Sequence, residues 1–167
     1  MRLMKRALFA LLALVLLWFG VRAIVRAFAS DETKIRWVVE DMADGFNETR
    51  MNPIMSGLTE DFLEDSHGAD KALARAGLAQ IFLQSKDPLT KKFPYRVRIP
   101  DEELRIEVQA GEPKSATADF MTRFDESKGE EWSSRWVASV HAELVDGPGG
   151  WKIRRARLDT REGQRLR

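Results

Sequence analysis

The chain has 167 residues, 27 of them lysine or arginine and 26 aspartate or glutamate, and it contains no cysteine. This length favours one folded domain. Without cysteine, the chain has no disulfide, thiolate metal site or cysteine nucleophile. Its two histidines offer little for a zinc or iron site. We therefore expect neither a metal nor a cofactor.

The near-neutral net charge hides an uneven distribution. Residues 1–29 carry five basic residues and no acidic one, whereas residues 151–167 carry seven basic and two acidic residues. Between them, residues 30–150 carry 15 basic and 24 acidic residues, which leaves this segment at −9. An acidic body repels phosphate backbones, so we expect no nucleic-acid partner.

The N-terminus has the pattern of a signal or membrane anchor. Residues 7–21 are uncharged and lie between two groups of basic residues: Arg2, Lys5, Arg6, Arg22 and Arg26. We expect a retained anchor over residues 7–29, because a helix of that length spans about 30 Å, enough to cross a bilayer. The alternative is a signal peptide cleaved after Ala29, since Ala27-Phe28-Ala29 fits a small-residue cleavage site.

The basic residues around this segment also predict an orientation. Arg22 and Arg26 lie four residues apart, on one face of a helix, and could reach lipid headgroups. The basic residues before the apolar run favour a cytoplasmic N-terminus. We therefore expect a single-pass membrane protein whose body lies outside the cytoplasm, in the periplasm if the source is bacterial.

Helices are expected in the first half of the body. Apolar residues at helical spacing predict a helix over residues 31–48, and Asn52-Pro53 begins a second, short one. Residues 59–63 look like a turn or a helical end, and residues 64–69 like a polar loop. Asp70 is expected to cap a third helix over residues 71–85, with Leu73, Leu78, Ile81 and Phe82 facing inward.

After Pro88 the hydrophobic period changes to two, which is typical of antiparallel strands with one packed face. The alternation predicts strands over 95–99, 104–108, 116–124 and 132–144, with a last strand from Trp151. In that last strand Ala156 and Leu158 are out of phase with Trp151 and Ile153, so we expect a bulge near residues 154–155. Residues 161–167 are expected to form a frayed basic tail.

Helices followed by strands indicate an α+β fold, with about three helices packed on a curved antiparallel sheet. The order and spacing of IRWVVEDMADGFNETR, LTEDF, KALARAGLAQIFLQ, EWSSRWVASVHAEL and GGWKIRRARLDT resemble the nuclear-transport-factor-2-like superfamily, also called SnoaL-like or cystatin-like. The resemblance covers residues 31–160 and implies a conical domain over residues 30–160. It also implies a cavity between the helices and the concave sheet.

Members of this superfamily include binding modules, dimerisation modules, membrane-tethered assembly proteins, and enzymes such as ketosteroid isomerase and scytalone dehydratase. The resemblance therefore implies a fold more than a function. The enzymes use a tyrosine with an acid, or with an acid and a histidine, inside the cone. The weak catalytic candidates here are Tyr95, His67 and Asp41, and each also fits a structural or solvated role.

Four aromatic residues are expected to line a pocket or an interface: Phe120, Trp132, Trp136 and Trp151. We expect the three tryptophans to be mostly buried. The leading hypothesis is a tethered, non-catalytic binding or assembly module. It would use an apolar cone pocket for a small ligand, or its sheet face for a homodimer or a protein partner. The alternative is an isomerase or dehydratase acting in the cone.

Overall fold

The structure is a computed structural model that describes residues 28–88, 90–129 and 131–166. The expected anchor, including Arg22 and Arg26, falls almost wholly outside these residues. Within the described part of the chain, no helix has both the length and the apolar character needed to cross a membrane.

Among the residues that the structure describes, three helices precede most of the sheet. Helix α2 spans Asp31–Asn47, α3 spans Met51–Ser56 and α4 spans Lys71–Gln84, close to the expected bounds. The Ser30 hydroxyl accepts a hydrogen bond from the Thr33 amide and caps α2. The Asp70 carboxylate accepts one from the Leu73 amide, at 2.8 Å, and caps α4 as predicted.

The described parts of the chain contain seven strands, which form one sheet in the order β2-β1-β7-β6-β5-β3, with β4 also paired to β5. Their bounds are Leu58–Glu64 for β1, Ala69–Asp70 for β2, Tyr95–Arg98 for β3, Arg105–Gln109 for β4, Ser115–Lys128 for β5, Glu131–Gly147 for β6 and Gly150–Gly163 for β7. A single-turn 3₁₀ helix, Asp101–Glu103, precedes β4. All pairs are antiparallel except β1 and β7, which are parallel.

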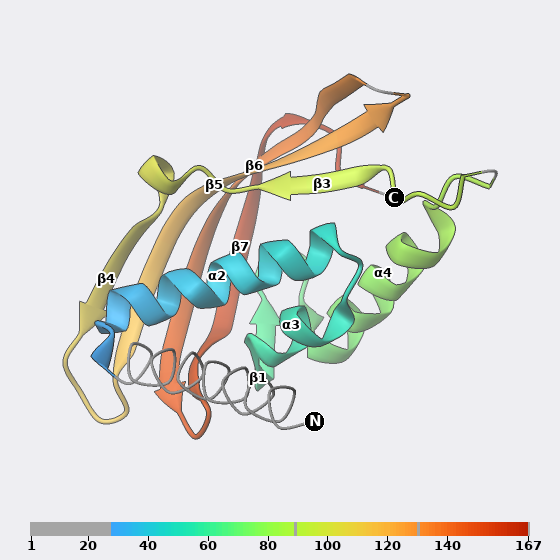
Figure 1. The fold of residues 1–167 in the computed structure, drawn as a ribbon. Helices are drawn as coiled ribbons and strands as arrows, with labels where there is room; N and C mark the ends of the chain where they lie inside the picture. The colour runs from blue at the N-terminus through green and yellow to red at the C-terminus, as the bar shows by residue number, and fades with distance from the viewer. Residues whose placement is uncertain (1–27, 89, 130, 167) are drawn as a thin grey trace, which may run out of the picture.

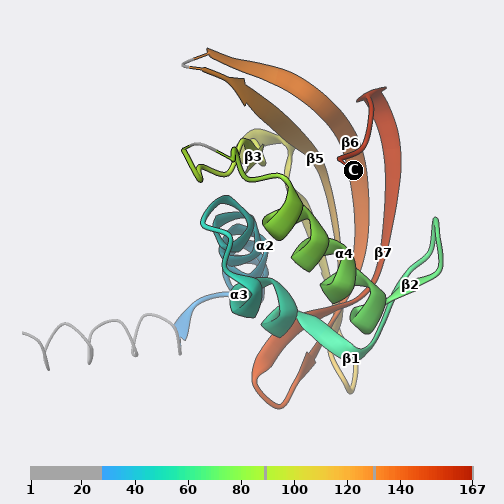
Figure 2. The ribbon, with the colours of Figure 1, turned by 90° about the vertical axis from the view of Figure 1, so that its right-hand side faces the viewer.

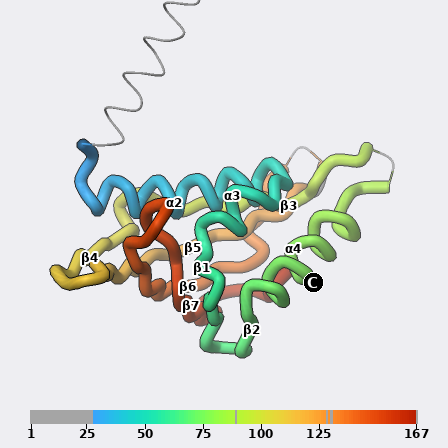
Figure 3. Tube along the Cα trace, turned by 90° about the horizontal axis from the view of Figure 1, so that it is seen from below, coloured from blue at the N-terminus to red at the C-terminus, as the bar shows by residue number. Residues whose placement is uncertain are grey.

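The sheet curls around the helices. Figure 2 shows the long strands β5, β6 and β7 bent into a wall, with α2, α3 and α4 on its concave side. In Figure 1, α2 crosses in front of the sheet. Helix α4 lies at the right of the picture, and β4 lies at the left. Viewed from below in Figure 3, α4 is inclined to α2. This arrangement confirms the expected α+β architecture with a curved sheet.

The predicted bulge in the last strand is confirmed. In the β6–β7 ladder Leu144 pairs with Ile153 and Glu143 with Arg155, so Arg154 is the extra residue. Both Ile153 and Ala156 are consequently buried on the concave side.

Two expectations for β1 and β7 were wrong. Residues 59–63 belong to strand β1 rather than to a turn, because the parallel pairing with β7 lies far away in the sequence and leaves no local signal. The end of the chain is ordered further than expected, since β7 continues to Gly163.

Two predictions of burial were also wrong. Leu73 is 58% exposed, because it points away from the sheet on the outer face of α4. Trp132 is 42% exposed, because the β5–β6 hairpin extends past the helices there, and the Arg96 guanidinium covers its ring at 4.2 Å. Trp136 and Trp151 are buried as predicted.

A buried carboxylate attaches β3 to β5. Asp125 is 2% exposed and accepts hydrogen bonds from the guanidinium groups of Arg96, at 2.9 Å, and Arg98, at 2.8 Å. Burial alone would raise the pKa of Asp125, but the hydrogen bonds and charges of Arg98 and Arg96 outweigh it and hold that pKa below its ordinary value. The carboxylate therefore stays ionised and fixes the edge of the sheet.

Gly163→Ala is expected to destabilise the fold by about 1–3 kcal/mol, because Gly163 has a φ of 75°. An added Cβ would also lie 2.1 Å from the Arg135 carbonyl oxygen. The control is Gly77→Ala within α4, where an added Cβ meets nothing within 4 Å. That variant should stabilise the helix by about 1 kcal/mol. Urea unfolding followed by circular dichroism measures both effects, and equal shifts of the same sign would contradict this account.

Candidate functional site: an apolar cavity in the cone

A cavity of about 320 Å³ lies between the helices and the concave face of the sheet. Helix α2 contributes Val39, Met42 and Phe46 to its lining, and α4 contributes Ala74 and Leu78. These positions recur at helical spacing, so one face of each helix is turned toward the cavity. The volume is at the lower end of the range for small-molecule sites, about 300–1,000 Å³.

The sheet supplies the opposite wall. Phe120 and Phe124 of β5, Val140 of β6 and Ile153 of β7 line it with apolar side chains. The register places Phe120 opposite Val140, which in turn pairs with Leu158, another lining residue. Phe120 thus lines the cavity.

Two polar residues occur among the described lining residues, Thr122 and Glu64. Thr122 is buried. Glu64 lies at the end of β1 on the same side of the strand as Phe62, and its side chain is 14% exposed. The Glu64 carboxylate accepts from the backbone amides of Ser66 and His67 and pairs with His67 Nδ1, each at 2.9 Å. Its oxygens are therefore engaged by the turn between β1 and β2.

These hydrogen bonds decide the charge of Glu64. Burial alone would raise its pKa, but the hydrogen bonds from Ser66 and His67 outweigh burial and leave the pKa below the ordinary value. Glu64 is consequently ionised at neutral pH and is a weak base, which suits a structural role in the turn better than proton abstraction.

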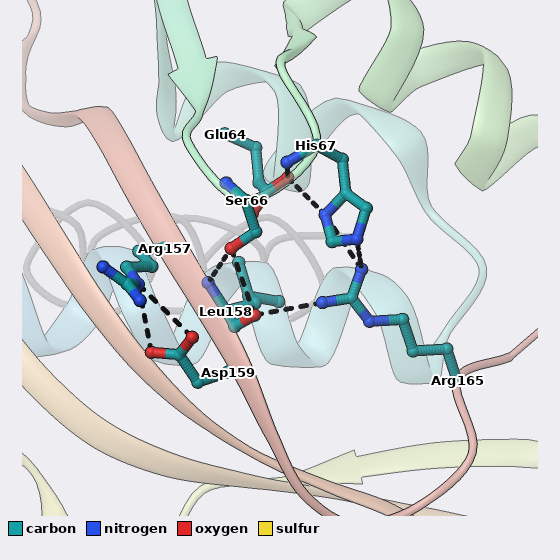
Figure 4. Close-up of polar contacts among 7 residues, drawn as sticks. All are labelled: Glu64, Ser66, His67, Arg157, Leu158, Asp159 and Arg165. Atoms are coloured by element: carbon teal, nitrogen blue, oxygen red, sulfur yellow. Dashed lines mark hydrogen bonds and ion pairs between the residues drawn. The ribbon is translucent and has the colours of Figure 1, made fainter.

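The C-terminal segment contacts the same turn. Arg165 places Nη1 2.7 Å from His67 Nε2, and its Nη2 donates to the Leu158 carbonyl at 3.0 Å. The same Nη1 lies 3.0 Å from His67 Nδ1, so the guanidinium is within reach of both ring nitrogens. Ser66 Oγ also donates to the Leu158 carbonyl, at 3.2 Å. Figure 4 shows these contacts joining the β1–β2 turn to β7, and both Glu64 and Leu158 line the cavity.

The three catalytic candidates lie in three different places. His67 is 54% exposed in the turn, and its ring is held between Glu64 and Arg165. Tyr95 packs edge-on against Phe93, with ring centroids 5.7 Å apart, and is not among the residues that line the cavity. Asp41 is exposed on α2 beside a polar surface hollow that includes Arg50 and Asn52. The structure therefore brings none of these three together.

Trp132, Trp136 and Trp151 are not among the residues that line the cavity. Trp136 stacks on Phe124, with ring centroids 4.7 Å apart and an interplanar angle of 20°, and its Nε1 donates to Thr160 Oγ1 at 3.1 Å. Trp151 is buried and donates to Asp31 at 3.3 Å. Trp136 is the cross-strand partner of Phe124, so it packs beside this cavity-lining residue on the same face of the sheet.

Other candidates remain at the surface. His141 pairs with Asp119 across β5 and β6 on the outer face of the sheet, at 2.7 Å. Within the described part of the chain, no group of three or more histidine or acidic side chains is placed to hold a metal ion.

No protein-family model matches the chain, and a comparison with curated proteins finds no match. Solved structures do match. One from Novosphingobium aromaticivorans, described as nuclear-transport-factor-2-like with a cystatin-like fold, superposes with a TM-score of 0.60 at 14% identity, covering 87% of this chain and 91% of that one. The body has a cystatin-like fold.

Two further structures support this fold. A Nostoc punctiforme domain of unknown function with a cystatin-like fold gives a TM-score of 0.59 at 17% identity, with 79% and 78% of the two chains covered. A Novosphingobium aromaticivorans protein described as a putative aromatic ring hydroxylase gives 0.56 at 15% identity, with 78% and 88% covered. At these identities the likeness shows the cystatin-like fold alone.

The sequence did not single out two features of the site. The sequence predicts a polar loop over residues 64–69, although the parity of Glu64 with Phe62 also fits a position on the inner side of a strand. The contact between Arg165 and His67 joins residues 98 positions apart, and no local pattern signals it.

Proposed function

We propose that this cystatin-like body is a non-catalytic binding module that encloses an apolar small molecule between α2, α4 and the sheet. The observation that carries the proposal is the cavity itself, whose described lining is apolar except for Thr122 and Glu64. Burial of apolar surface contributes roughly 25 cal/mol per Å², so a hydrocarbon or aromatic compound gains affinity there without a polar anchor.

The proposal includes the location expected from the sequence. A body tethered by residues 7–29 outside the cytoplasm would hold sparingly soluble ligands close to a membrane. The acidic charge of the body is compatible with such ligands, because a neutral apolar compound is neither attracted nor repelled by it.

An isomerase or dehydratase acting in the cone is the second candidate, since Glu64 places a carboxylate at the cavity edge. The engagement of that carboxylate by Ser66 and His67 favours the binding module instead. So does the separation of Tyr95 and Asp41 from the cavity, because acid–base catalysis needs groups within hydrogen-bonding reach of one reacting atom.

Binding of 4-fluorobiphenyl to the full chain in lipid nanodiscs tests the proposal. A bound ¹⁹F NMR signal is expected for the wild type. Ala74→Phe puts a phenyl ring into the cavity and should weaken binding at least about tenfold, the loss of roughly 1.4 kcal/mol of apolar contact.

The matched control is Ala76→Phe, which adds the same ring to the exposed face of the same helix and should leave the bound signal unchanged. An equal loss of binding in both variants, or no bound signal in the wild type, would refute the cavity as the site. Turnover of a cyclic ketone or alcohol that disappears in Glu64→Gln would favour the enzyme.

A further inference from the structure

Helix α4 separates the cavity from the outside, yet it is poorly covered itself. Among its fourteen residues, all of which the structure describes, Phe82 alone is buried. Ala74 and Leu78 line the cavity from its inner face. Leu73 is 58% exposed and Leu83 is 77% exposed, so two large apolar side chains point outward.

The outer face of α4 has an unusual composition for a helix in contact with water. Successive residues are 100° apart around a helix, which places Leu73 and Leu83 on the same outward side. The other exposed residues there are Ala72, Ala76, Gly77, Gln80 and Gln84. None of them is charged, whereas the outer face of a solvated helix normally carries charges. This face is therefore suited to an apolar neighbour.

Positive charge is concentrated beside this face. Residues 71–94 contain five basic residues and one acidic residue, in a body that is acidic as a whole. Arg75, Lys86, Lys91 and Lys92 are exposed. The fifth basic residue, Lys71, forms an ion pair with Glu60. An uncharged face with two leucines beside three exposed lysines and one exposed arginine is complementary to a surface with an apolar interior and anionic groups at its boundary with water.

We propose that the outer face of α4, with Leu73 and Leu83, docks on an anionic lipid surface. Leucine side chains would enter the acyl boundary, and the basic residues 86, 91 and 92 would lie among the headgroups. A protein partner fits less well, because the charge that accompanies this face is mostly positive, five basic residues against one acidic residue over residues 71–94, as attraction to an anionic lipid surface requires.

The position of α4 gives this contact a role. Its two faces would touch the lipid and the cavity, about one helix diameter apart, roughly 10 Å. An apolar ligand dissolved in the membrane would then enter the cavity by displacement of α4, without crossing water. That role rests on the proposed function, whereas the contact with lipid does not.

The test uses the full chain in vesicles, and it exploits the absence of cysteine. Leu83→Cys and Glu107→Cys each introduce a single site for a nitroxide label. Residue 107 is exposed on β4, which lies on the opposite side of the molecule from α4 (Figure 1). In vesicles of phosphatidylcholine and phosphatidylglycerol, the label at 83 should be accessible to dissolved oxygen and shielded from a water-soluble nickel complex. The label at 107 should show the reverse.

The charge requirement is tested with Lys86→Gln, Lys91→Gln and Lys92→Gln combined. Each basic residue near an anionic surface contributes about 1 kcal/mol, which is about a fivefold change in the docking equilibrium. Removal of all three charges should therefore lower the ratio of docked to undocked α4 on the order of a hundredfold. Vesicles of phosphatidylcholine alone should weaken docking in the same direction. Circular dichroism would show that each labelled variant keeps its fold.

Two results would overturn the proposal. One is a label at 83 that is as accessible to the nickel complex as the label at 107. The other is dipolar coupling between two labels at 83, which would identify a second copy of the chain as the neighbour. Neither result depends on a ligand, so the binding of 4-fluorobiphenyl can succeed while this proposal fails, and the reverse.

Discussion

Trp136→Ala is expected to lower the free energy of unfolding by about 3–5 kcal/mol, a large part of the stability of a domain this size. Trp136 is 7% exposed, stacks on Phe124 and donates a hydrogen bond to Thr160. Its removal leaves a void beside Phe124, a residue of the cavity wall, whereas the exposed Thr160 hydroxyl can bond to water instead. Urea unfolding of the full chain in a mild detergent, extrapolated to water, measures the loss.

Trp132→Ala is the matched control, because it removes the same side chain from the same strand at an exposed position. Its ring contacts the Arg96 guanidinium, and a cation–π pair at an exposed site contributes about 0.5–1 kcal/mol. We expect a loss of that size. If the two variants lost equal stability, the division between the packed and the extended parts of β6 would be wrong.

Asp125→Ala is expected to cost about 2–3 kcal/mol, since charge-assisted hydrogen bonds contribute about 1.5–3 kcal/mol. Asp125 is buried, whereas Arg96 and Arg98 are partly exposed and can turn toward water once the carboxylate is gone. Because the two arginines can be hydrated in this way, the expected loss of stability is smaller than for breaking a fully buried ion pair. Asp125→Asn retains the shape and should recover part of the loss.

The same carboxylate predicts how stability depends on pH. The pKa of Asp125 is lower in the folded protein than in the unfolded chain, so the unfolded state takes up a proton first as the pH falls. The ionised Asp125 therefore makes its full contribution to the free energy of unfolding at neutral pH. This contribution decreases once the pH drops below the ordinary aspartate value, about 3.9, and is lost at the lowered folded value. In Asp125→Asn this part of the acid dependence should be absent, and an unchanged profile would contradict the assignment.

Elements with a local signal could be predicted from the sequence. The helix caps at Ser30 and Asp70 follow from side chains that accept from nearby amides, and the bulge at Arg154 follows from a change of parity within one strand. Each of these features depends on residues a few positions apart.

Features that depend on distant pairing could not be predicted. Strand β1 exists because its backbone bonds to β7, about ninety residues later, and Glu64 faces the cavity for the same reason. Leu73 has the spacing of an inward residue, but α4 approaches the sheet through a neighbouring face. The aromatic residues show the same limit, since alternation placed Phe120 on the inner side but could not show that the hairpin around Trp132 extends beyond the helices.

The central claim is that an apolar molecule binds inside the cone. Nuclear Overhauser effects between bound 4-fluorobiphenyl and methyl-labelled full chain in nanodiscs test it most directly. The account predicts contacts to the methyl groups of Leu78 on α4 and Val140 on β6, which face each other across the cavity. Contacts confined to Leu73 and Leu83, on the outer face of α4, would contradict it.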